Sequence, residues 1–185
     1  MSFLLYLWLP IVLSAVFVFL LSGLLHMALP WHKHDFKKLP NEDAVRDALR
    51  PFNVPPGDYM TPSCENGDYN SPEFKAKIDA GPNVVMTVMP SGQCSMAPMF
   101  IQWTIFLLLV GTFTAYIAVI ALPGDAPARM VFRTVAAVSF LAYAAAQWPQ
   151  SIWLRRSWSS TIKFTVDGLL YGLVTGATFA WFWPE

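Results

Sequence analysis

Four long apolar stretches, separated by shorter polar segments, dominate the pattern of the chain. They cover residues 3–29, 98–122, 128–148 and 162–183. An α-helix rises about 1.5 Å per residue, so about 20 apolar residues are needed to cross the hydrocarbon core of a bilayer. Each stretch reaches that length. The pattern therefore predicts a mainly α, integral membrane protein with four transmembrane helices.

Aromatic and charged residues mark the ends of these stretches. Tryptophans gather at lipid–water boundaries, and six of them fall near the predicted ends: Trp8, Trp31, Trp103, Trp148, Trp181 and Trp183. The first stretch has no positively charged start, and its apolar run is longer than that of a signal peptide. We expect it to be retained as a membrane helix.

Residues 31–97, between the first two stretches, predict a small α+β extramembrane cap. Asn41 followed by Glu42 and Asp43 is typical of a helix start, as is Ser71 followed by Pro72. The run 84–89 is the best strand candidate, and 59–61 is a second one. The expected organisation is thus a first helix in 1–30, a cap in 31–97 and three helices in 98–185.

Composition and charge fit a membrane protein and indicate its orientation. Apolar residues make up 55% of the chain and charged residues only 13%, and the mean hydropathy is +0.44. Net charge is zero, so nothing favours a nucleic-acid partner. Ten Lys and Arg lie in 31–97 or 149–163 and two in the segment 123–133, which places the cap in the cytoplasm and both termini outside. Cys64 and Cys94 would then be free thiols.

A repeat of small residues marks the last helix. Gly168, Gly172, Gly176 and Ala180 are spaced four apart and so share one helix face. Such a face lets another backbone approach closely. Its partner is either another helix of this chain or a separate subunit, pigment or lipid tail.

Few polar residues suggest chemistry. Asp167 follows Lys163 by four residues, which predicts an interfacial ion pair on one helix face. His26, His32 and His34 cluster at the end of the first helix and are the candidates for a metal or pigment, because imidazole is a common ligand. The neighbouring Trp31, Lys33 and Asp35 indicate an ordinary interfacial stretch instead.

Sequence signatures of catalysis and of cofactor binding are absent. The chain has no phosphate-binding loop, no dinucleotide fingerprint, no nucleophile elbow and no metalloprotease helix. We therefore expect no catalytic residue and no cofactor bound through a recognisable motif. Contacts with lipid or pigment remain open.

Several short motifs together resemble a family of uncharacterised bacterial membrane proteins of about this length. They are Trp31-His32-Lys33-x-Asp35-Phe36, Leu39-Pro40-Asn41-Glu42-Asp43, Gly81-Pro82, Met86-Thr87-Val88 and Asp167-Gly168-Leu169-Leu170-Tyr171-Gly172. The resemblance covers nearly the whole chain and implies the bacterial inner membrane. It brings no activity, so no functional residue is carried over from it.

Two functional hypotheses follow. The first is a non-catalytic accessory subunit of a larger bacterial membrane assembly, such as a photosynthetic reaction-centre and light-harvesting complex or a respiratory complex, docking to other membrane subunits through helix faces. The second is a small membrane enzyme or transporter. A polar cavity lined by several of the polar residues of the spans, with Asp167 or His26 opening into it, would favour the second.

Overall fold

The computed structural model describes residues 3–65, 67–92 and 95–184, and the chain forms two compact units. The helical unit comprises Met1–Lys37 and Ser95–Glu185, and the loop unit comprises Lys38–Cys94. The helical unit thus includes residues 31–37, which the sequence had assigned to the cap. The reason is that side chains of this segment bind the last helix, as described below.

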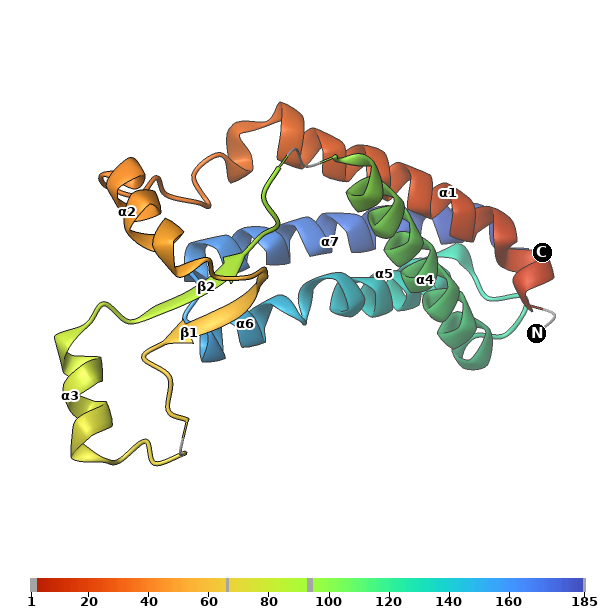
Figure 1. Ribbon diagram of the computed structural model, residues 1–185. Helices are drawn as coiled ribbons and strands as arrows, with labels where there is room; N and C mark the ends of the chain where they lie inside the picture. Colours follow the sequence, from red (N-terminus) through yellow and green to blue (C-terminus); the bar gives the residue numbers. More distant parts are fainter. Residues whose placement is uncertain (1–2, 66, 93–94, 185) are drawn as a thin grey trace. The chain divides into compact units, whose positions relative to one another are not determined.

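Four long helices build the helical unit (Figure 1). They are α1 (Phe3–Gly23), α4 (Ala97–Ala121), α5 (Ala128–Ala144) and α7 (Trp158–Trp181). Shorter helical segments follow α1 and α5: a π-helical turn (Leu24–Ala28), a 3-10 turn (Pro30–His32) and α6 (Gln147–Trp153). The mainly helical prediction is confirmed.

Three segments of the described chain are long and apolar enough to cross a membrane. They are Leu5–Ala28, Ala97–Ala121 and Ala128–Trp153. The helix α7 has 24 residues, but its glycines, its threonines and Asp167 lower its hydropathy. It also starts at Trp158, four residues earlier than expected. The third segment is interrupted after Ala144, because Pro149 has no N–H to continue the helical hydrogen bonding.

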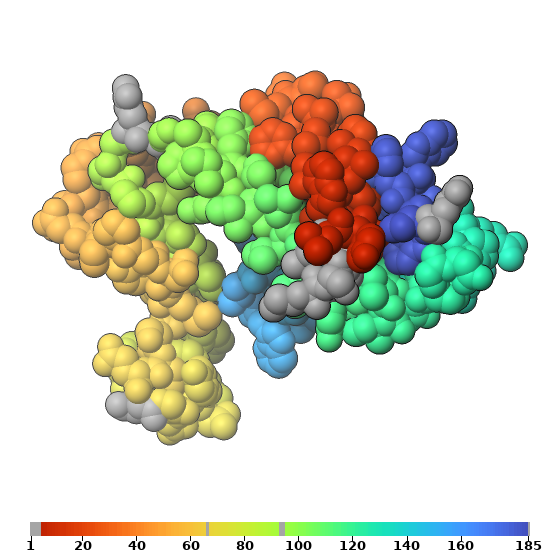
Figure 2. Space-filling model, turned by 90° about the vertical axis from the view of Figure 1, so that its right-hand side faces the viewer, coloured from red at the N-terminus to blue at the C-terminus, as the bar shows by residue number. Residues whose placement is uncertain are grey.

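The helix α7 contacts both α5 and α1, and α4 contacts α1 and α5. The start of α1, the α4–α5 connection and the end of α7 gather at one end of the unit (Figures 1 and 2). Trp183 Nε1 donates to the carbonyl oxygen of Gly124 at 3.1 Å there. A core around Leu7, Val131 and Phe179 fills this end, and a second core around Val18 and Leu107 continues beyond it.

The small-residue face of α7 packs against α5 of the same chain. A Cβ at Gly172 would lie 2.9 Å from the carbonyl oxygen of Ala136, and one at Gly176 would lie 2.8 Å from the Ala136 Cβ. A Cβ at Gly168 would lie 2.9 Å from the Ala144 Cβ. Only glycine permits this approach of the two backbones, so this face is occupied within the chain. Ala180, the fourth member, is partly buried against the first core.

The loop unit is a two-stranded sheet with two short helices. Strand β1 (Gly57–Thr61) pairs antiparallel with β2 (Val84–Val88), and Gly57 lies opposite Val88. The helices are α2 (Glu42–Leu49) and α3 (Pro72–Ala80). The Ser71 hydroxyl accepts from the Phe74 N–H, so the expected cap is present. Asn41 occupies the cap position of α2 without a side-chain cap bond. Cys64 is a free thiol, and Cys94 lies outside the described residues.

The contact between α7 and α5 predicts the effect of one added methyl group. Gly172→Ala should destabilise the protein by about 1–3 kcal/mol, because the methyl group meets backbone atoms that have no room to move. Gly23→Ala is the control, since that position is helical and no heavy atom lies within 4 Å of an added Cβ. The control should be neutral or more stable by up to about 1 kcal/mol. Thermal unfolding in mild detergent measures both, and equal effects would contradict the packing argument.

Candidate functional site

The path of the chain after α1 brings two histidines to α7. The π-helical turn holds His26, and π-helical turns are frequent at functional sites. Pro30 then ends the helix and forces the preceding Leu29 into an extended conformation. A 3-10 turn follows, which places Trp31 and His32 against α7.

Asp167 is the acceptor that these residues meet. It is the tenth residue of α7, about 14 Å along the helix, and it is 1% exposed. Trp31 Nε1 donates to Oδ1 at 3.1 Å, and His32 Nε2 lies 2.7 Å from Oδ2. The apolar stretch that begins at residue 162 would place Asp167 about one turn inside the helix. Because α7 begins at Trp158, Asp167 lies further from the start of the helix. A buried carboxylate needs such partners, because its desolvation is costly.

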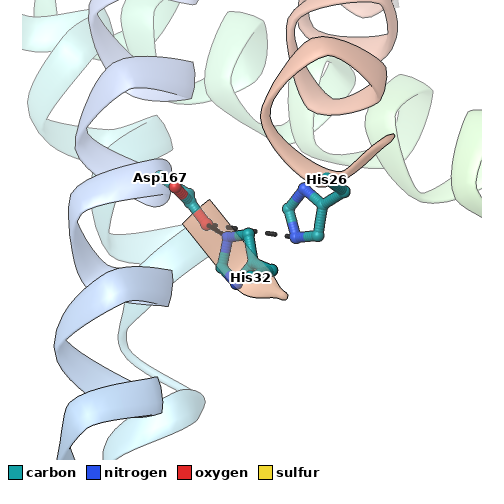
Figure 3. Close-up of side chains that lie close together, drawn as sticks. All are labelled: His26, His32 and Asp167. Carbon is teal, nitrogen blue, oxygen red and sulfur yellow. Dashed lines mark hydrogen bonds and ion pairs between the residues drawn. The ribbon is translucent and has the colours of Figure 1, made fainter. Parts of the chain in front are cut away.

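His32 lies between two carboxylates (Figure 3 shows the contact with Asp167). Its Nδ1 lies 2.6 Å from Asp35 Oδ2, and its Nε2 lies 2.7 Å from Asp167 Oδ2. An ionised carboxylate only accepts hydrogen bonds, so with both carboxylates ionised both ring nitrogens donate and the ring is an imidazolium. The Phe164 ring stacks on it at 5.0 Å between centroids. His32 thus joins two acidic side chains from different segments.

His26 stands beside this bridge with a different hydrogen bond. Its ring stacks on that of His32 with 4.1 Å between centroids and an 8° angle between planes. Its Nδ1 lies 3.1 Å from the Ser22 carbonyl oxygen, which accepts only, so Nδ1 carries the proton. Its Nε2 lies 4.0 Å from Asp167 Oδ2 (Figure 3). In the neutral ring, Nε2 then carries the lone pair.

Lys163 forms an ion pair with Asp35. The ion pair between Lys163 and Asp167 expected from the sequence is not formed. Lys163 Nζ lies 2.6 Å from Asp35 Oδ1, and the carboxylate of Asp167 binds His32 instead. Asp167 is buried against the segment after α1, whereas Lys163 is more exposed. Burial raises the pKa of the Asp35 carboxyl, but the hydrogen bonds and charges of Lys163 and His32 outweigh it. The pKa of Asp35 consequently lies below its ordinary value of 3.8.

The structure brings together two of the three histidines singled out in the sequence. Within the described part of the chain, His26, His32 and Asp167 form a group whose ligand atoms lie within 4.8 Å of one another. His34 is exposed and outside that group. Sequence reasoning missed Trp31 and Asp35 as members of the site. The only signal was the spacing Trp31-His32-x-x-Asp35, which has no established meaning by itself.

An open cavity of about 710 Å³ adjoins the group within the helical unit. Its volume lies in the range of small-molecule sites. Aromatic rings and methionines form most of its wall, and its polar lining includes His26, Asp167 and Tyr171. The lining residues are Ser22, Gly23, His26, Met27, Met96, Met99, Phe100, Gln102, Trp103, Phe106, Ala142, Tyr143, Ala146, Gln147, Phe164, Asp167 and Tyr171.

Comparison with known proteins adds no assignment. No protein-family model matches the chain, and neither a curated protein nor a solved structure matches it. The resemblance to a bacterial membrane-protein family therefore stays an expectation, and the site itself is the basis for a proposed function.

The ion pair of Lys163 predicts a specific energetic coupling. Lys163→Met and Asp35→Asn should be non-additive by about 0.5–3 kcal/mol, because each variant removes the same hydrogen-bonded contact. Coupling of Lys163→Met with Asp167→Asn should be smaller, since those two side chains bind different partners. A double-mutant cycle on the free energy of unfolding measures both. Larger coupling with Asp167 would restore the pairing expected from the sequence.

Proposed function

We propose that this chain is an integral membrane protein whose four long helices all span the bilayer. Large apolar side chains on the outer faces of α1 and α4 support this proposal. Leu5 is 78% exposed, and Ile120 and Phe113 are 68% and 63% exposed. An apolar surface of this extent is costly in water and ordinary in lipid.

The helix α7 is proposed as the fourth span despite its lower hydropathy. Its 24 residues measure about 36 Å, enough for a hydrocarbon core of about 30 Å. It is packed between α1 and α5, so much of its surface faces protein and need not be apolar. Its two charged residues, Lys163 and Asp167, both have partners of opposite charge.

The proposed location is the bacterial inner membrane, with residues 31–97 in the cytoplasm. The excess of Lys and Arg in that segment and in 149–163 is the basis of this orientation. The start of α1 and the end of α7 gather at one end of the helical unit, as an even number of crossings requires.

The orientation predicts which cysteines react from outside the cell. An impermeant thiol reagent should leave Cys64 and Cys94 unlabelled in intact cells and label them after permeabilisation. A control variant carries Gly124→Cys in a background without the two native thiols. Gly124 is exposed in the α4–α5 connection and should react in intact cells. The reverse pattern would invert the topology.

One motive for the accessory-subunit hypothesis was the small-residue face of α7. That face is covered by α5 within the chain. The outer faces of α1 and α4 remain, and lipid covers such faces as well as another subunit does. The cavity beside Asp167 gives a more specific indication of function.

We propose that the protein binds an amphiphilic molecule from the bilayer, as a small membrane enzyme or transporter does. The apolar part of the molecule would lie against Met99, Trp103 and Phe106 of α4. Its polar head would lie beside Asp167 and Tyr171. A largely apolar wall that also carries a buried carboxyl group matches such a molecule.

The observation that carries this proposal is the hydroxyl of Tyr171. Tyr171 is 4% exposed and lines the cavity, yet its hydroxyl has no hydrogen-bond partner among the residues that the structure describes. A buried polar atom without a partner costs about 1–3 kcal/mol. The hydroxyl itself is buried, so a small movement of the side chain would bring it to the polar head of a bound molecule, which would supply that partner.

Filling the cavity predicts loss of the bound molecule. Ala142→Trp should abolish retention of a specific lipid through purification in mild detergent, because Ala142 lines the cavity. Lipid extraction followed by mass spectrometry measures the molecules retained per chain.

Ala145→Trp is the matched control, since Ala145 is exposed and is outside the cavity lining. It should keep the lipid profile of the parent. Thermal unfolding verifies that both variants are folded. If the parent and Ala142→Trp retain the same molecules in the same amounts, the cavity does not bind a specific amphiphile.

A further inference from the structure

We propose that His26, His32 and Asp167 bind a divalent transition-metal ion, through Nε2 of each histidine and Oδ2 of the aspartate. Imidazole nitrogen with carboxylate oxygen is a donor set that suits zinc, iron, copper and nickel. Two histidines and one carboxylate leave coordination positions open for water or another ligand. The proposal does not depend on the amphiphile.

The first argument is the position of His26. Its Nδ1–H donates to the Ser22 carbonyl oxygen, and its Nε2 lies 4.0 Å from Asp167 Oδ2. In the neutral ring this nitrogen carries a lone pair that faces the carboxylate. A lone pair and a carboxylate oxygen repel each other unless a cation lies between them. The bridge of His32 between two carboxylates is complete without His26, so that bridge does not explain why His26 is there.

The second argument is that every ligand already has an outer partner. His26 donates Nδ1–H to a backbone carbonyl, and His32 donates Nδ1–H to the Asp35 carboxylate. The remaining oxygen of Asp167 accepts from Trp31 Nε1. Metal-binding histidines almost always make such a bond through the other ring nitrogen, which fixes the tautomer and orients the ring. Lys163 in turn holds Asp35.

The distances require only small movements. Ligand atoms around a tetrahedral zinc are about 3.3 Å apart, given bonds of about 2.0–2.1 Å. One ligand atom from each of the three residues lies within 4.8 Å of the others. His32 Nε2 is 2.7 Å from Asp167 Oδ2, and His26 Nε2 is 4.0 Å from the same oxygen. The stacked imidazoles do not share a plane, so one ring has to turn. His26 is free to do so, because its side chain is 36% exposed.

Binding exchanges one cation for another. The His32 Nε2 proton, which now lies between the ring and Asp167, leaves to solvent, and the metal ion takes its place. The ring stays bound to Asp35 through Nδ1–H. The site gains one positive charge, since a divalent ion replaces one proton. His26 and Asp167 line the cavity, so the open positions of the metal would be reached from there.

A metal titration tests the proposal. The full-length protein, purified in detergent and treated with a chelator, should bind one Zn²⁺ per chain by calorimetry and one Co²⁺ by absorption. His26→Phe keeps a ring for the stack and removes the ligand, and it should weaken binding by more than about 100-fold. His34→Phe is the matched control and should bind like the parent, since His34 lies outside the group.

A second measurement keeps the test independent of folding. Pulsed EPR of bound Cu²⁺ counts the imidazoles on the unaltered protein, and two are expected. The proposal is overturned if no stoichiometric binding occurs, if one imidazole is found, or if His26→Phe binds like the parent.

Discussion

The carboxylate of Asp167 is the group on which the arrangement of the helical unit depends. It is buried in α7, and its two oxygens accept from Trp31 and His32, which follow α1 in the chain. A buried charge without partners is strongly unfavourable, so these contacts fix the position of that segment against α7. The same segment carries Asp35, which draws in Lys163. Residues 31–37 belong to the helical unit because of this network.

Two kinds of interaction hold α7 to its neighbours, close backbone packing and the polar network around Asp167. Beyond Asp167 the helix presents glycines to α5, where backbones touch and dispersion holds the pair. At Asp167 it presents charge to the segment after α1. One helix thereby fixes two neighbours by different forces. The cavity lies beside the polar end of this helix, where aromatic side chains of α4 face Tyr171.

The network also explains how charged groups persist in an apolar protein. With His32 protonated and both carboxylates ionised, His32 and Lys163 balance Asp35 and Asp167. A neutral His26 would add a ring whose Nε2 carries a lone pair. A polar network without net charge is stable by itself. The lone pair of His26 Nε2 is then available to coordinate a cation. This property makes the site a candidate for chemistry that the sequence motifs did not indicate.

The sequence alone determined the helical class, the positions of the long helices, the two short helices and the two strands. Hydrophobic length and local caps are properties of neighbouring residues, so they are visible without a fold. Partners far apart in the chain are not visible in this way. Lys163 and Asp167 are four residues apart and looked like a pair, yet each binds a residue more than 100 positions away. Only the tertiary structure decided this, because burial of Asp167 selects the partners that reach it.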